Sequence, residues 1–143
     1  MASAAPARKA DPDQREQDLI WGILLAIRAQ SVKALDNRGG LLHRVLAKVL
    51  DEKREAIGQA LGFVPTPHPL FGEFRCLIEA LDEAHRADLI GFLNPHYREI
   101  VLKVHPDTAH QILQDLSQRE ELSRELAERF LFHYRQLISN QRD

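Results

Sequence analysis

The chain has 143 residues, of which 44% are hydrophobic and 28% are charged. This composition is typical of one ordinary domain, and the length is sufficient to bury a core without disulfides or metal ions. The 19 basic and 21 acidic residues give a formal net charge of -2, which argues against binding nucleic acid or anionic membranes through bulk charge alone. The single cysteine, Cys76, excludes an intramolecular disulfide and a cysteine-based zinc site, and it suits a reducing cytoplasm.

The first ten residues are rich in alanine and proline, and we expect residues 1–10 to form a disordered tail. The apolar run Leu19–Ile27 follows four acidic residues, an arrangement that does not fit an export signal. The run also falls well short of the roughly 20 residues that span a bilayer. We therefore expect a cytoplasmic protein with a single all-helical domain over residues 11–143, and the many Ala, Arg and Leu residues favour a bacterial source.

Residues 11–62 carry the signals of two long helices. Asp11 and Pro12 are typical of an N-cap and a first helical residue, and the periodicity predicts a helix from there to about Leu35. A turn over residues 36–40 precedes a second predicted helix from about Leu41 to Leu61, which Gly62 ends. The two helices are expected to form an antiparallel hairpin.

Residues 63–69 contain three prolines and predict a stiff linker, because each proline fixes its own φ and restricts the preceding residue. Beyond the linker, candidate cap residues recur at intervals of 12, 11 and 12 residues: Asp82, Asn94, His105 and Ser117. This period predicts helices of about two turns, which must stack to bury their apolar faces. A longer helix over about residues 118–140 is expected to close residues 70–143.

The capping rhythm, as in Leu93-Asn94-Pro95, resembles the short-helix superhelical modules of the cytosolic N-domain of MgtE magnesium transporters and of the flagellar switch protein FliG. The resemblance covers roughly 40 residues and implies an armadillo-like helical stack. The predicted fold class is therefore all-α, with a long-helix hairpin, a stack of short helices and a long C-terminal helix. The resemblance carries no function.

Catalytic and metal-binding patterns are missing from the sequence. Four histidines lie within 26 residues (His85, His96, His105 and His110), but their spacing does not place a ligand set on one helix face, and we expect them to be solvated or to cap helices. Cys76 lies in an apolar helical run, where cysteine usually behaves as a small buried hydrophobe. We expect no enzyme activity, no cofactor and no metal.

A basic segment between Arg28 and Arg54 is a possible anion-binding face. Five of its residues form the proposed site: Arg38, Gly39, Gly40, Arg44 and Lys48. A helix that opens on glycines near arginines can bind phosphate or carboxylate through its free backbone N–H groups. The alternative is an ordinary solvated face, which the absence of interleaved aromatic residues favours.

The first predicted helix is apolar on almost every side, so it must be buried all round. Either it lies at the centre of the domain or another chain covers it, and in the second case Ile20, Trp21, Leu24 and Ile27 would form the interface. Phe132, which lies among charged residues on the last helix, is a further candidate interface anchor.

These patterns predict a non-enzymatic, cytoplasmic protein-interaction module, such as an adaptor, a chaperone-like protein or a regulatory subunit. Excess apolar helix surface predicts that it self-associates, with a homodimer as the expected form, and does not insert into a membrane. The alternative function is a nucleic-acid-associated subunit of a larger complex that uses the basic face within residues 28–54.

Overall fold

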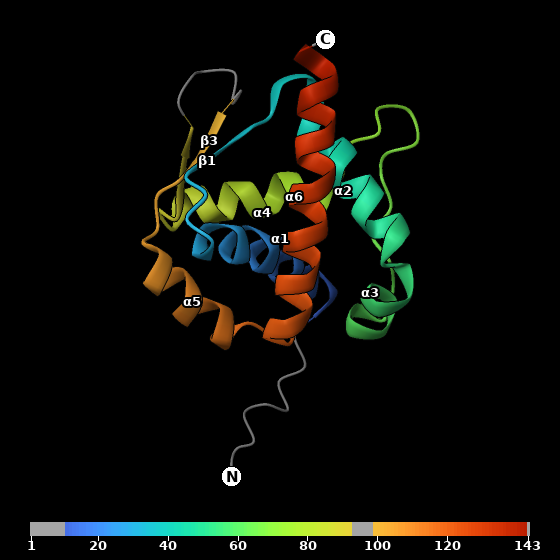
Figure 1. Ribbon diagram of the computed structural model, residues 1–143. Coiled ribbons are helices and arrows are strands. Elements are labelled where there is room, and N and C mark those ends of the chain that lie inside the picture. The colour runs from blue at the N-terminus through green and yellow to red at the C-terminus, as the bar shows by residue number, and fades with distance from the viewer. Residues whose placement is uncertain (1–10, 93–98, 143) are drawn as a thin grey trace.

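The computed structural model describes residues 11–92 and 99–142, and they are mostly helical (Figure 1). The elements in chain order are α1 (Pro12–Ala29), β1 (Ala34–Asp36), a short 3-10 turn η2 (Arg38–Gly40), α2 (Leu41–Glu52), α3 (Arg54–Leu61), α4 (Arg75–Arg86), β2 (Ile90–Phe92), β3 (Glu99–Leu102), α5 (Pro106–Asp115) and α6 (Glu120–Arg142). Helix α6 crosses the molecule at a steep angle to α1 and α4, and the small sheet lies at one side of the molecule, near the ends of these two helices (Figure 1).

The three strands form an antiparallel sheet in the order β1-β3-β2. Ala34 pairs with Val101 on one side of β3, and Ile90 pairs with Leu102 on the other. The predicted all-α class therefore needs correction to a mostly helical fold with a small sheet.

The predicted stack of short helices is wrong at residues 90–92 and 99–102, which form strands β2 and β3. In β3, buried Ile100 and Leu102 alternate with half-buried neighbours, which is the period-two pattern of a strand. Asp82, a predicted helix start, lies inside α4. Leu93-Asn94-Pro95 lies outside the described residues.

The predicted hairpin of two long helices is not formed as expected. Helix α1 ends at Ala29 instead of Leu35, because Ser31 adopts a positive φ of 71° and the chain then enters β1. The second predicted helix is divided at Lys53 into α2 and α3. Helix α1 packs mainly against α4, α5 and α6, and α2 packs against α6.

Several helix ends are as predicted. The Asp11 side chain accepts a hydrogen bond from the Gln14 N–H at 2.7 Å and caps α1. Gly62 ends α3 in the left-handed conformation, with φ of 89°. His105 caps α5, which begins at Pro106. These signals are local, so neighbouring residues suffice to define them.

Helix α1 lies at the centre of the core, with α4, α5 and α6 around it. The residues from Leu19 to Ile27 are buried except for Trp21, which is half-buried. The apolar helix is therefore buried by its own chain, which is the first of the two alternatives predicted from the sequence. Gly22 permits the close approach of α6, because a Cβ at this position would overlap the Ser123 hydroxyl.

Candidate functional site

The predicted interface on α1 is covered by the protein itself. Ile20, Leu24 and Ile27 are 2%, 5% and 0% exposed and belong to the core. The Trp21 indole packs beside α4, where its Nε1–H donates a hydrogen bond to the Ala80 carbonyl at 2.9 Å. Ile20, Leu24 and Ile27 therefore serve the interior of the chain, while Trp21 is half-buried.

Phe132 remains at the surface of α6, with 42% of its area exposed. The Arg129 guanidinium lies 4.4 Å from the centre of its ring, which is a cation–π distance, and the His133 ring approaches it edge-on. Phe132 is thus exposed among charged residues, as predicted. Arg129 covers part of its ring.

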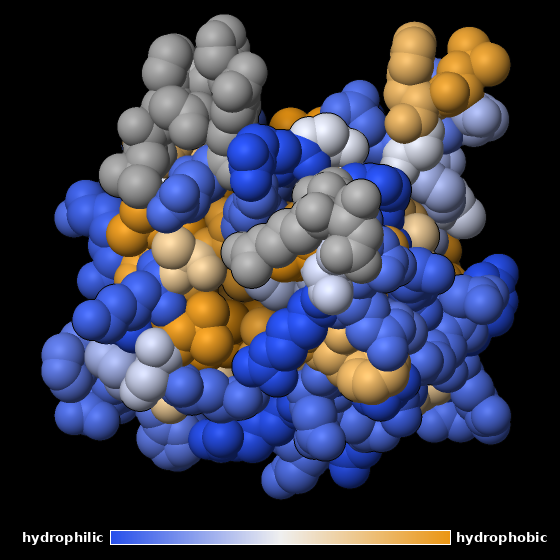
Figure 2. Space-filling view, turned by 45° about the horizontal axis from the view of Figure 1, so that its top comes forward, coloured by the Kyte–Doolittle hydropathy of each residue, from blue (hydrophilic) through white to orange (hydrophobic). Residues whose placement is uncertain are grey.

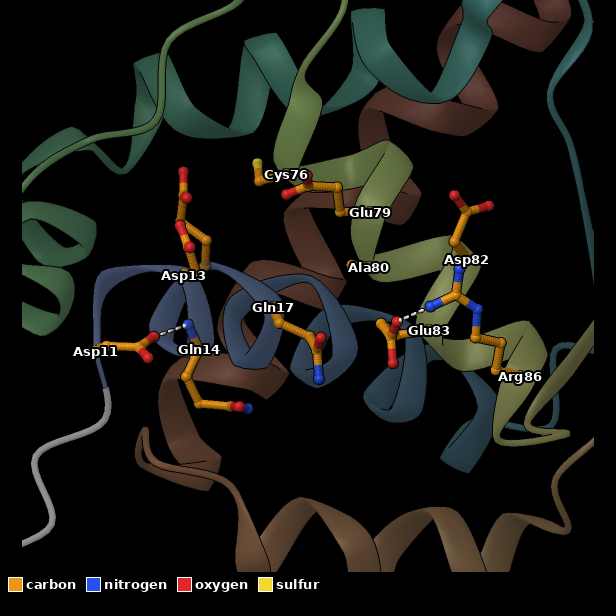
Figure 3. Close-up of a pocket in the computed structure, with 11 residues that line it drawn as sticks. Asp11, Asp13, Gln14, Gln17, Cys76, Glu79, Ala80, Asp82, Glu83 and Arg86 are labelled. Carbon is orange, nitrogen blue, oxygen red and sulfur yellow. Dashed lines mark hydrogen bonds and ion pairs between the residues drawn. The ribbon is translucent and has the colours of Figure 1, made fainter.

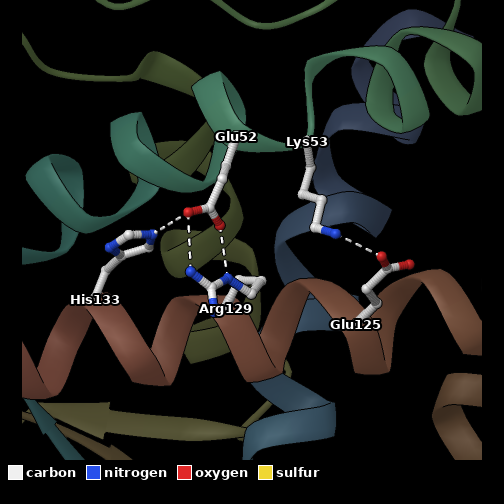
Figure 4. A network of polar contacts seen from close by, with 5 residues as sticks. All are labelled: Glu52, Lys53, Glu125, Arg129 and His133. Atoms are coloured by element: carbon white, nitrogen blue, oxygen red, sulfur yellow. Dashed lines mark hydrogen bonds and ion pairs between the residues drawn. The ribbon is translucent and has the colours of Figure 1, made fainter.

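The charged residues near Phe132 join α2 to α6 (Figure 4). Glu52 accepts hydrogen bonds from Arg129 at 2.7 and 2.9 Å and lies 3.0 Å from His133, while Lys53 pairs with Glu125 at 2.6 Å. The hydrogen bonds from Arg129, supported by His133, lower the pKa of Glu52 to about 2. The arrangement orients the two helices and leaves no free cationic group among these five side chains.

The predicted anion site is only partly assembled. Arg38 forms an ion pair with Asp36, with 2.8 Å between Nη2 and Oδ2. Gly39 and Gly40 have the positive φ values that their turn requires, 62° and 72°. However, the N–H groups at the start of α2 are partly used, since Leu42 donates to the Asn37 side chain at 3.1 Å and Leu41 donates to the Arg38 carbonyl.

Two basic residues of that site do reach solvent. Arg44 and Lys48 lie one turn apart on α2, and both are exposed. No hydrogen bond or ion pair engages either side chain within the described part of the chain. They form a small basic face without the third cation that the sequence pattern predicted.

The most exposed hydrophobic residues are ones that the sequence analysis did not select. Leu70 and Phe71 are 82% and 72% exposed. They occupy the loop between α3 and α4, which projects at the upper right of Figure 1, and Figure 2 shows hydrophobic residues standing clear of the surface there. We name residues 68–73 the apolar loop. The signal was a Leu-Phe pair between Pro69 and Gly72, two residues that favour turns.

The backbone of the apolar loop is held in place by hydrogen bonds. His68 and Glu73 are joined across its base, since the His68 N–H donates to the Glu73 carbonyl at 2.8 Å, and the Gly72 N–H donates to the His68 carbonyl at 2.8 Å. Gly72 has a φ of 68°, which closes the turn and favours glycine. The loop therefore presents its two apolar side chains from a fixed turn.

Two imidazoles complete the support of this segment. His68 Nδ1 accepts the N–H groups of Leu70 and Phe71 at 3.1 and 3.3 Å, and its ring stacks on Phe71 with 4.9 Å between centres. His43, a buried residue of α2, accepts the N–H of Phe74 through Nδ1 at 2.9 Å. Burial lowers the pKa of His43, although the nearby Glu73 charge opposes the shift.

A groove of about 470 Å³ lies between the start of α1 and α4 (Figure 3). Its walls are mainly acidic and include six carboxylates: Asp11, Asp13, Glu16, Glu79, Asp82 and Glu83. Arg86 pairs with Glu83 there, while Arg75 pairs with Glu79 at 2.9 Å. Burial, reinforced by the charges of Asp13 and Glu79, raises the pKa of Glu16.

Cys76 lines the same groove and is 7% exposed. Burial raises the pKa of its thiol to about 12, so the thiolate that nucleophilic chemistry requires is disfavoured. The groove thus offers charge but no activated nucleophile.

The histidines behave in different ways. His105 accepts the Asp107 N–H at 3.1 Å and caps α5, as predicted, while His110 contacts Arg124 at 2.9 Å. His85 packs edge-on against Phe92, and His96 lies outside the described residues. Within residues 11–92 and 99–142, no three His, Cys, Asp or Glu side chains are placed to hold a metal ion.

No helix among the described residues combines the length and apolar character needed to cross a membrane. No protein-family model, curated protein or solved structure matches the chain. The candidate site thus rests on the geometry of this chain.

Proposed function

We propose that the protein is a non-enzymatic protein-interaction module that anchors a partner through Leu70 and Phe71. The single observation that carries this proposal is the exposure of these side chains, 82% and 72%, on a turn whose backbone is hydrogen-bonded. Leu70 and Phe71 are adjacent, and contiguous exposed apolar surface, unlike a lone exposed apolar residue, marks interaction sites. The adaptor and regulatory roles expected from the sequence are specific forms of this proposal.

The fixed turn favours binding energetically. Burial of a leucine or phenylalanine side chain contributes about 1.5–3 kcal/mol each. A flexible loop would lose part of that energy when its backbone becomes ordered on binding. In the apolar loop, the bonds to His68 have already ordered the backbone before a partner arrives.

The chemistry of the groove agrees with a non-enzymatic role. Its cysteine is protonated at neutral pH because burial raises the thiol pKa to about 12. Four of its six carboxylates are exposed, and Glu79 and Glu83 pair with Arg75 and Arg86, an arrangement common on solvated protein faces.

The test is site-specific photo-crosslinking. A photoreactive phenylalanine analogue at position 71 should crosslink to a partner in cells of the source organism, whereas the same analogue at exposed Gln59 on α3 should not. The partner, once purified, should bind the Leu70→Ser/Phe71→Ser variant about 100-fold more weakly than the parent. Crosslinks that are equal at both positions, or an unchanged Kd, would contradict the proposal.

Nucleic-acid association is the second candidate function, and one observation favours it. Arg44 and Lys48 are exposed one turn apart on α2 and could contact a phosphate backbone. Because Arg38 is paired with Asp36, the face offers two cations, which is few for a stand-alone binder. Salt-dependent retention of the parent on DNA or RNA would support this candidate.

A further inference from the structure

Three backbone N–H groups in and beside the apolar loop donate to imidazole nitrogens. Leu70 and Phe71 donate to His68 Nδ1, and Phe74 donates to His43 Nδ1. A nitrogen that accepts a hydrogen bond carries no proton, so these hydrogen bonds require each imidazole to be neutral, with its proton on Nε2. The hydrogen bonds at the two ends of the segment therefore form only while His68 and His43 are both neutral.

Protonation would reverse the role of each Nδ1 atom. A protonated imidazole donates from both nitrogens, so Nδ1 would face the backbone N–H groups with a hydrogen of its own. All three hydrogen bonds would then be lost. The backbone bonds between His68 and Glu73, and between Gly72 and His68, do not involve an imidazole, so they would remain.

The surroundings of the two rings differ. His43 is 7% exposed and lies parallel to the Phe74 ring at 6.4 Å between centres, where burial lowers its pKa. Glu73 is the charged group that acts on it, and it favours the protonated form. His68 is exposed, and the Phe71 ring stacks on it. Its backbone N–H donates to the Glu73 carbonyl.

We propose that His43 and His68 form a pH-sensitive latch that fixes the apolar loop when both are neutral and releases it on acidification. At the tip, protonation of His68 frees the N–H groups of Leu70 and Phe71. At the base, protonation of His43 frees the start of α4 at Phe74. Weaker partner binding in acid would follow only if the proposed function is correct, whereas the latch itself is a property of the isolated protein.

The experiment is an NMR titration of the 15N-labelled full chain from pH 7.5 to 5. The amide protons of Leu70 and Phe71 should move upfield together as histidine takes up its proton, and their 15N heteronuclear NOE values should fall. The amide of Ile57 in α3 is the control, because its acceptor is the Lys53 backbone carbonyl, at 2.9 Å, and no histidine lies in this helix.

His68→Asn is the decisive variant. An asparagine Oδ1 can replace Nδ1 as an acceptor but cannot be protonated in this range, so the Leu70 and Phe71 amides should no longer titrate. His68 is exposed, so this variant should fold, and the amide of buried Ile57 should report that it does. In His43→Asn, the Phe74 amide should lose its titration while the tip keeps it.

Three results would overturn the latch: static Leu70 and Phe71 amides in the parent, an unchanged titration in His68→Asn, or a titration that the Ile57 amide shares. Because no partner is present, this outcome is separate from the crosslinking test of function. A loop that opens in acid while crosslinking at position 71 fails would support the latch and refute the interaction role.

Discussion

Asp18 and Ser117 are 99 residues apart in the chain, yet the Ser117 N–H donates to Asp18 Oδ2 at 2.9 Å. Asp18 is 5% exposed, and its other oxygen accepts from the Gln14 side chain at 2.8 Å. The carboxylate therefore ties α1 to the junction between α5 and α6. This single side chain connects the central helix to the last third of the molecule.

Replacement of Asp18 by alanine should lower the free energy of unfolding by about 1–3 kcal/mol, because it leaves the Ser117 N–H without its acceptor. Asp18→Asn should cost less, since an amide oxygen can still accept. Urea denaturation gives both values. Asp51→Asn, at an exposed position of α2, is the control, and a loss as large there would show that the effect is not specific to the junction.

Gly22→Ala should destabilise the protein by about 1–3 kcal/mol, because the new methyl group would overlap the Ser123 hydroxyl and the Gln118 amide. Gly58→Ala is a matched control within helix α3. A Cβ there meets Val64 at an ordinary 3.7 Å, so the change should instead raise stability by about 0.4–1 kcal/mol. In thermal unfolding, the Tm should therefore fall for Gly22→Ala and rise for Gly58→Ala.

Stability should fall as the pH falls below about 6.5, the ordinary histidine value, because burial lowers the pKa of His43 in the folded state. The unfolded chain then binds a proton that the folded chain resists. The contribution of neutral, buried His43 to the free energy of unfolding is fully present above that pH. It is lost as the pH falls toward the lowered pKa of His43. Urea midpoints across pH 8 to 5 should depend less on pH in His43→Asn, whereas His85→Asn, at an exposed position, should keep the dependence of the parent.

Arg44→Glu with Lys48→Glu should leave stability nearly unchanged, within about 0.5 kcal/mol for each substitution, because both residues are exposed. We expect no salt-sensitive retention of the parent on nucleic acid, and a slower on-rate for the double variant if an acidic partner uses this face. Salt-sensitive binding by the parent that the double variant loses would favour the nucleic-acid alternative.

Self-association should appear in light scattering as a species heavier than the 16.3 kDa chain at high micromolar concentration. Exposed apolar side chains are the physical reason, and Phe132 and the apolar loop provide them, since Ile20, Leu24 and Ile27 are buried. Phe132→Ser and Leu70→Ser/Phe71→Ser, measured separately, should identify which surface carries the contact. A monomer over the whole range would refute this prediction.

The sequence predicted the features that neighbouring residues determine. Asp11 caps α1, Gly62 ends α3 and His105 caps α5, because each needs only residues within one helical turn. The strands could not be predicted in this way. Ala34 pairs with Val101, far along the chain, and strands of three or four residues are too short for a period-two pattern to be recognised.

The candidate site was predicted in part, for a related reason. The apolar character of α1 was plain from Leu19 to Ile27, but whether its own chain or another covers it depends on where α5 and α6 pack. Conversely, Leu70 and Phe71 are residue types typical of a core, and their flanking Pro69 and Gly72 predict a turn but do not predict that its side chains are exposed. Their exposure follows from the turn that His68 and Gly72 form, which is a property of the folded backbone.

The central position of α1 also has a consequence for synthesis of the protein. Helix α1 is synthesised before α5 and α6, which are among the helices that cover it. Part of its apolar surface therefore stays uncovered until α5 and α6 have been translated. Contacts between such distant segments also slow folding, so nascent chains stalled before Glu120 should bind chaperones strongly.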